Sequence, residues 1–112
     1  MEIIFQSQKL KKECNDIRLL VKQYGDRQAL RLRQRLDELR AANRLSDVSH
    51  LPPSRLHELI GDKAGVFSID LIHPYRLLVV PANDPIPRKP DGGIDLTKVT
   101  IIMILRVEDT HG

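Results

Sequence analysis

The 112-residue sequence contains one cysteine, no tryptophan, and only two phenylalanines and two tyrosines. A single thiol excludes an internal disulfide and any zinc site built from several cysteines. Cys14 therefore fits a small buried side chain better than a catalytic thiol. With so few aromatic rings, aliphatic side chains must build the core. The chain is long enough for one hydrophobic core and too short for two, so we expect a single domain over residues 1–112.

Long hydrophobic runs are also missing from the sequence. The segment MEIIFQSQKLKKE turns polar after its first five residues, and it lacks the pattern of a signal peptide. We therefore expect a cytoplasmic protein with no membrane partner.

The net charge of +3 is unevenly distributed along the chain. Residues 1–44 carry eleven basic and six acidic side chains, whereas residues 45–112 carry seven basic and nine acidic ones. A basic half in a small domain indicates a polyanionic partner such as nucleic acid, but a solvated helix face has the same composition. Charge alone leaves both interpretations open.

Two amphipathic helices are predicted in this basic half. The first lies between a cap at Ser7 and a stop at Gly25, and its apolar stripe is Leu10, Cys14, Ile17 and Val21. The second is capped by Asp26, and its apolar stripe is Ala29, Leu32, Leu36 and Leu39. Arginines expected largely away from this second stripe are Arg27, Arg31, Arg35 and Arg40. Together the two helices form a helical hairpin.

Strand patterns surround and follow the helices. EIIF at residues 2–5 predicts a short strand, VFSIDLI and YRLLVVP predict an antiparallel hairpin, and KVTIIMILRV predicts the last strand. The Pro- and Gly-rich stretch at residues 81–97 is expected to be a long connection with a mobile tip and no assigned role. The predicted fold is a two-layer α+β domain in which the helices pack on one face of a small, mostly antiparallel sheet.

Polar residues that could carry chemistry lie in two places. The stretch RLHELIGDKAG at residues 55–65 holds His57, Asp62 and Lys63 just before the apolar strands. Taken alone, a histidine in this setting is more often a hydrogen-bonded residue at the edge of the core. Near the end of the chain, Asp109 and His111 are two residues apart, so in an extended strand they would point to one side as a proton-transfer pair.

These patterns in this order resemble the RelE/ParE toxin superfamily, and most closely its HigB branch, the "killer protein" toxins. The resemblance is carried by the stretch from His57 to Gly61 with Asp62-Lys63 and Gly65, by Phe67-Ser68-Ile69, by Tyr75-Arg76, and by Asp109-Thr110-His111. It covers nearly the whole chain and implies a compact sheet with two helices across one face.

The resemblance implies a ribonuclease that cuts messenger RNA in the ribosomal A site, with no metal and no cofactor. The ribose 2′-hydroxyl attacks the adjacent phosphate and leaves a cyclic phosphate and a 5′-hydroxyl. The residues that match the catalytic set by position are His57, Asp109 and His111. Arg76 matches the strand arginine that faces the scissile phosphate, and Lys63 and Arg55 are weaker candidates for phosphate contact. On the basic helices, the candidates for sequence-independent RNA contacts are Arg27, Arg31, Arg35 and Arg40.

The sequence departs from the family pattern at Thr110, where tyrosine usually stands between the acid and the histidine. Threonine cannot stack on a base, and its hydroxyl is a poorer acid than a phenol. Two alternatives therefore stay open: a toxin that inhibits DNA gyrase without ribonuclease chemistry, as in the ParE branch, and a degenerate member that only binds an antitoxin. The partners implied are the ribosome, its messenger RNA, and a helix-turn-helix, HigA-like antitoxin.

Overall fold

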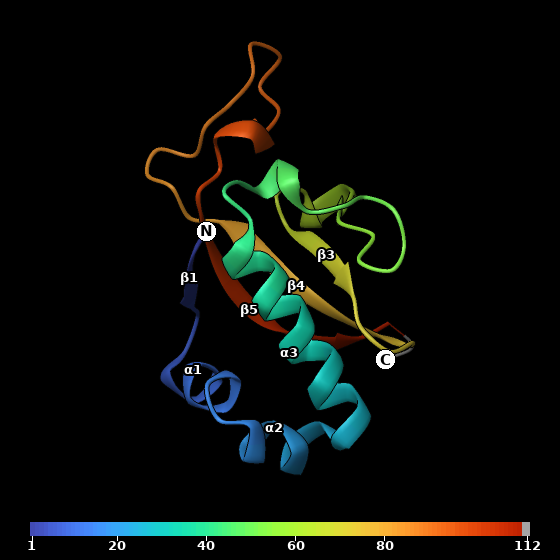
Figure 1. Ribbon diagram of the computed structural model, residues 1–112. Coiled ribbons are helices and arrows are strands. Elements are labelled where there is room, and N and C mark those ends of the chain that lie inside the picture. Colours follow the sequence, from blue (N-terminus) through green and yellow to red (C-terminus); the bar gives the residue numbers. More distant parts are fainter. Residues whose placement is uncertain (111–112) are drawn as a thin grey trace.

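The strands form one five-stranded sheet in the order β1-β5-β4-β3-β2 in this computed structural model, which describes residues 1–110 (Figure 1). Only the pair of β1 and β5 is parallel, and the other neighbours are antiparallel. The strands are β1 (Glu2–Phe5), β2 (His57–Glu58), β3 (Phe67–Asp70), β4 (Tyr75–Pro81) and β5 (Ile101–Asp109). The predicted strand at residues 2–5 and the predicted hairpin are thus confirmed, whereas β2 was not anticipated.

Three helices lie between β1 and β2, rather than the two that were predicted. They are α1 (Gln8–Cys14), α2 (Ile17–Tyr24) and α3 (Asp26–Ala41). The helix expected between Ser7 and Gly25 breaks because Asp16 adopts an extended backbone and its carboxylate accepts a hydrogen bond from the Arg18 amide, which starts a new helix. Gly25 then joins α2 to α3 at a φ of 83°, a conformation that glycine adopts without strain.

The core forms where α3 crosses one face of the sheet, as Figure 1 shows. The predicted stripe of α3 is fully buried there, and it consists of Ala29, Leu32, Leu36 and Leu39. The strands contribute the other side of the same cluster through Phe67, Ile69, Leu77, Val79, Ile102 and Ile104. Burial of these aliphatic side chains supplies the main favourable free energy of folding. The two-layer α+β architecture is therefore as the sequence predicted.

Along β3 and at the start of β4 the second face of the sheet carries polar side chains, because successive residues of a strand point to opposite faces, and we call this part the polar face. On β3, Phe67 and Ile69 pack in the core, so Ser68 lies on the opposite face. Across the sheet, Arg76 is paired with Asp70 on one side and with Glu108 on the other. A bulge in β5 between the pairs of Leu78 and Val79 shifts the register and brings Glu108 opposite Arg76.

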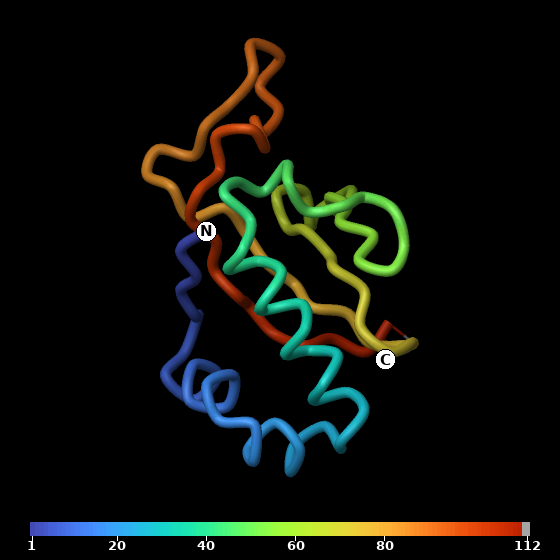
Figure 2. Tube along the Cα trace, in the orientation of Figure 1, coloured from blue at the N-terminus to red at the C-terminus, as the bar shows by residue number. Residues whose placement is uncertain are grey.

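The connection from β4 to β5 projects away from the sheet and folds back on itself, as the tube in Figure 2 shows. Arg88 and Ile94 form an antiparallel bridge across it, and Ile94 is buried against the core. A short 3₁₀ helix at Leu96–Lys98 leads into β5. No helix within residues 1–110 is long and apolar enough to cross a membrane.

Candidate functional site

A cavity of about 210 Å³ opens on the polar face of the sheet. Its wall combines β2, β3, the start of β4 and the turn that joins β3 to β4. The polar side chains around it belong to Arg55, His57, Ser68, Asp70, His73, Tyr75 and Arg76. Thr110, just after β5, also lines the cavity. Figure 2 shows the end of β5 next to the β3–β4 turn.

His57 reaches the cavity because β2 adds to the edge of the sheet. In this pair His57 lies opposite Ser68, so both residues lie on the polar face. The Nδ1 atom of His57 lies 2.8 Å from the carbonyl oxygen of Arg55. A carbonyl can only accept a hydrogen bond, so Nδ1 carries the proton of the neutral ring and Nε2 is left as the acceptor. This tautomer suits a general base.

Arg76 is held by Glu108 on the neighbouring strand. One carboxylate oxygen of Glu108 accepts hydrogen bonds from Nε and Nη2 of Arg76 at 2.9 and 2.5 Å. The other oxygen lies 3.7 Å from Nζ of Lys63 and 3.4 Å from Nη2 of Arg106. These three cations, with Arg76 first among them, hold the pKa of Glu108 below its ordinary value. Glu108 is therefore ionised at neutral pH and positions the guanidinium at the cavity.

Arg55 occupies the rim on the other side of the cavity. Its Nε donates to a carboxylate oxygen of Asp70 at 2.6 Å. Its backbone has a φ of 47°, in the left-handed region that a residue with a side chain rarely adopts. This strained conformation directs the Arg55 carbonyl to His57, and strained residues of this kind cluster at functional sites.

Ser68 contributes a buried hydroxyl to the floor of the cavity. The residue has no exposed surface, and its oxygen is the one buried side-chain polar atom without a hydrogen-bond partner among the described residues. Such a group is uncommon because burying an unpaired hydroxyl costs free energy. Its position opposite His57 makes it part of the same site.

The predicted tail residues are only partly brought to the cavity. Thr110 lines it, but its hydroxyl and its amide both donate to the carbonyl oxygen of Pro74, at 2.7 and 2.9 Å. Asp109 pairs with Tyr75, one residue before the pair of Arg76 with Glu108. Strand alternation therefore puts Asp109 on the face opposite Arg76, and it does not line the cavity.

The expectation that Asp109 and His111 form a side-by-side pair depends on an extended strand through both residues. β5 ends at Asp109, and His111 lies outside the described residues. Of the predicted catalytic set, the described part of the chain thus unites His57 with Arg76. Lys63 and Arg55 join them, the first through Glu108 and the second at the rim.

The basic residues of α3 lie in the helical layer, away from the cavity. Arg27 and Arg40 are exposed and Arg31 is half-buried, as a solvated helix face requires. The expectation for Arg35 was wrong, because its side chain is only 3% exposed. Its guanidinium donates to the carbonyl oxygens of Asp70 and Pro53 and to the carboxylate of Glu38. Arg35 therefore joins α3 to the sheet and cannot contact RNA.

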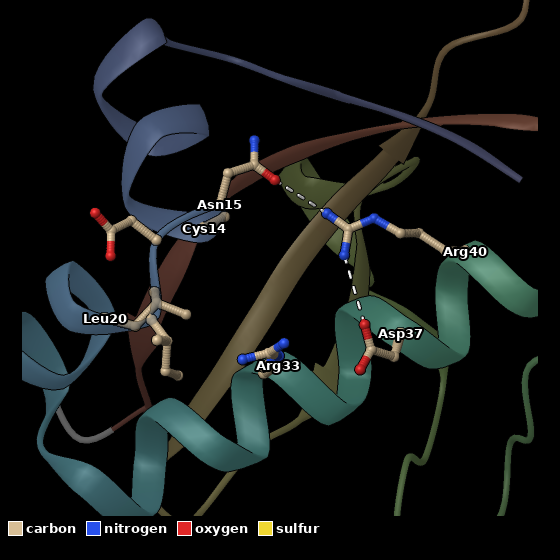
Figure 3. Close-up of a pocket in the computed structure, with 8 residues that line it drawn as sticks. Cys14, Asn15, Leu20, Arg33, Asp37 and Arg40 are labelled. Atoms are coloured by element: carbon tan, nitrogen blue, oxygen red, sulfur yellow. Dashed lines mark hydrogen bonds and ion pairs between the residues drawn. The ribbon is translucent and has the colours of Figure 1, made fainter.

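A second cleft, of about 500 Å³, lies between α1–α2 and α3 (Figure 3). Arg40 crosses it, with its guanidinium 3.4 Å from the Asn15 side-chain oxygen and 3.6 Å from the Asp37 carboxylate. Cys14 lines the cleft, and burial raises the pKa of its thiol to about 11. The thiol is therefore almost fully protonated at neutral pH and a poor nucleophile, which agrees with its assignment as a small buried side chain.

Sequence reasoning missed four residues of the cavity region, namely Ser68, Asp70, His73 and Glu108. Two of them flank Arg76 in the sheet, and strand alternation around Arg76 is the signal that could have found Asp70. No cluster of three or more potential metal ligands occurs among residues 1–110. In comparisons with known proteins, the sequence matches no family model and no curated protein.

Proposed function

We propose that this chain is the toxin of a type II toxin–antitoxin system and acts as a ribosome-dependent endoribonuclease on messenger RNA. The observation that carries the proposal is that His57 and Arg76 line one cavity, with Nδ1 of His57 hydrogen-bonded to the Arg55 carbonyl oxygen so that Nε2 is turned away from that bond. A base and a guanidinium around one small cavity are two of the groups that metal-independent cleavage of a phosphodiester requires.

In this proposal His57 takes the proton from the ribose 2′-hydroxyl as that oxygen attacks the adjacent phosphorus. Arg76 uses two of its five N–H groups on Glu108, so three remain for the phosphate oxygens. Because Glu108 already fixes the guanidinium, little conformational entropy is lost when phosphate binds. The products are a 2′,3′-cyclic phosphate and a 5′-hydroxyl. The partners would be the ribosome and a helix-turn-helix antitoxin in the cytoplasm.

A second candidate is a non-enzymatic toxin that inhibits DNA gyrase. Two observations favour it: the Thr110 hydroxyl is already bonded to Pro74, and Asp109 lies on the other face of the sheet. The expected tail machinery is thus incomplete at the cavity. A DNA-damage response without RNA cuts would identify this alternative.

The experiment is primer extension on messenger RNA from cells in which the protein is induced. The wild-type protein should produce cuts in the reading frame. His57→Ala should reduce cleavage roughly 100- to 10,000-fold, as expected for loss of a general base. Arg76→Ala should reduce it about 100-fold, as expected for loss of one preorganised donor.

Matched controls are His50→Ala and Arg88→Ala, which remove one exposed histidine and one exposed arginine outside the cavity. Both should cut at the wild-type rate. All four variants should melt cooperatively and bind the antitoxin as wild type does, and only Arg76→Ala should melt at a somewhat lower temperature, because it removes the ion pair with Glu108. A well-folded double variant, His57→Ala with Arg76→Ala, that still cuts messenger RNA would exclude the ribonuclease at this cavity.

A further inference from the structure

A second imidazole lines the cavity, in addition to His57. His73 lies in the turn between β3 and β4, and its side chain is exposed. His73 and Pro74 stand between the two strands of the hairpin that the sequence predicts. The structure gives the site two histidines, contributed by the strand at one edge and by the turn at one end of the sheet.

The sheet register gives the order of these groups along the cavity. His57 lies opposite Ser68, and Arg76 lies opposite Asp70, two residues further along β3. Two residues of a strand span about 6.6 Å. The chain then enters the turn that carries His73. Along the direction of β3, Arg76 therefore lies between the two imidazoles.

This order matches what phosphodiester cleavage needs. In an in-line displacement the attacking and leaving oxygens lie on opposite sides of the phosphorus, so the base and the acid must stand on opposite sides of the group that holds the phosphate. His57 and Arg76 fill two of these three positions, and the third lies at the turn.

Three other groups at or near the cavity, those of Thr110, Glu108 and Asp109, do not fit the acid role. The Thr110 hydroxyl already donates to the Pro74 carbonyl oxygen. Glu108 is ionised, because its bonds to Arg76 lower its pKa, and therefore it has no proton to give. Asp109 does not line the cavity. An imidazole, by contrast, can be protonated and still give up its proton near neutral pH.

We propose that His73 is a catalytic residue of the reaction assigned above, acting as the general acid. This inference rests on the proposed function. As the bond from the 2′-oxygen to phosphorus forms, the 2′-hydroxyl proton passes to Nε2 of His57. As the bond from phosphorus to the 5′-oxygen breaks, the imidazolium of His73 gives its proton to that oxygen. Solvent then takes the proton from His57 and returns one to His73.

The test is the dependence of the rate on the leaving group. Ribosomes are programmed with a synthetic message, and a second message carries sulfur in place of the 5′-bridging oxygen at the cleavage site. A thiolate leaves without a proton, so the second message needs no general acid. On the normal message His73→Gln should cleave roughly 100- to 10,000-fold more slowly than wild type. On the sulfur message it should cleave within about threefold of wild type.

Two further variants serve as controls for this experiment. His57→Gln should be slow on both messages, because the base is needed for attack in each case. His50→Gln, which changes an exposed histidine outside the cavity, should match wild type on both. All variants should melt at the wild-type temperature, which shows that the turn is intact.

The remaining outcomes contradict either the acid role of His73 or the proposed function. If the wild-type protein cuts the normal message but His73→Gln is unimpaired on it, or is slowed equally on both, the acid role is wrong and the proposed function stands. If the wild-type protein cuts neither message, the proposed function is overturned together with the acid role.

Discussion

Arg76 and Glu108 face each other across β4 and β5, and a single carboxylate oxygen accepts from two nitrogens of the guanidinium. Both side chains are about four-fifths buried, with 22% and 20% exposed. Partial burial weakens solvent screening, so this pair is stronger than an ordinary surface ion pair. The pair fixes the direction in which Arg76 enters the cavity.

Glu108→Gln should change how stability depends on pH. Since the folded-state pKa of Glu108 lies below its ordinary value of 4.5, the ionised carboxylate stabilises the fold at higher pH. This contribution is present above pH 4.5 and is lost as the pH falls through the lower folded-state value. At pH 7 the variant should be less stable by about 1 kcal/mol.

The measurement is urea unfolding of both proteins between pH 7 and pH 3. The difference in unfolding free energy should shrink as the solution becomes acidic, while other carboxylates titrate equally in both proteins. A difference that stays constant over this range would show that Glu108 does not stabilise the fold through its charge.

Variants of Arg35 and of its neighbours on α3 should distinguish a structural role from a role in binding RNA. Arg35→Ala removes bonds to two carbonyl oxygens and to Glu38 from a buried position, so it should destabilise the fold by about 3 kcal/mol. The double variant Arg27→Ala with Arg31→Ala should melt normally. It should nevertheless weaken co-sedimentation with ribosomes and flatten its salt dependence, because fewer phosphate contacts release fewer counterions.

The control for that pair is the double variant Arg88→Ala with Lys98→Ala, which removes the same charge from exposed positions between β4 and β5. If both double variants bind ribosomes as wild type does, α3 presents only a solvated face. A stable Arg35→Ala protein would contradict its assignment as a structural link between α3 and the sheet.

Ser68 and Ser54 are both buried serines, and their hydroxyl groups can be compared directly. The Ser54 hydroxyl donates to Glu38 at 3.0 Å, whereas the Ser68 hydroxyl makes no hydrogen bond within the described residues. Ser54→Ala should therefore cost about 1.5 kcal/mol, and Ser68→Ala should be neutral or stabilising. Thermal melts of the two variants test this. Equal destabilisation would mean that the Ser68 hydroxyl has a partner, such as an ordered water.

The sequence by itself determined the elements whose hydrophobic period extends over several turns or residues. The spacing of hydrophobic residues indicates both the type of an element and the face that it buries. This spacing predicted the α3 stripe from Ala29 to Leu39 and the strands at residues 2–5 and 75–81. From these elements the two-layer fold follows. The sequence also named His57 and Arg76 as site candidates, through the family resemblance and their chemistry, and both line the cavity.

The tertiary structure determined the features that depend on contacts between residues far apart in the chain. β2 has two residues, too few for any period, and exists only because β3 offers an edge. Arg35 has the sequence environment of a solvated arginine, yet it is buried and donates to the carbonyl oxygens of Asp70 at the end of β3 and of Pro53 in a distant loop. A bulge in β5 brings Glu108 rather than Val107 opposite Arg76, and no single strand pattern reveals the register between two strands. Pairing and packing of the whole sheet set this register. The register therefore determines which residues lie at the site.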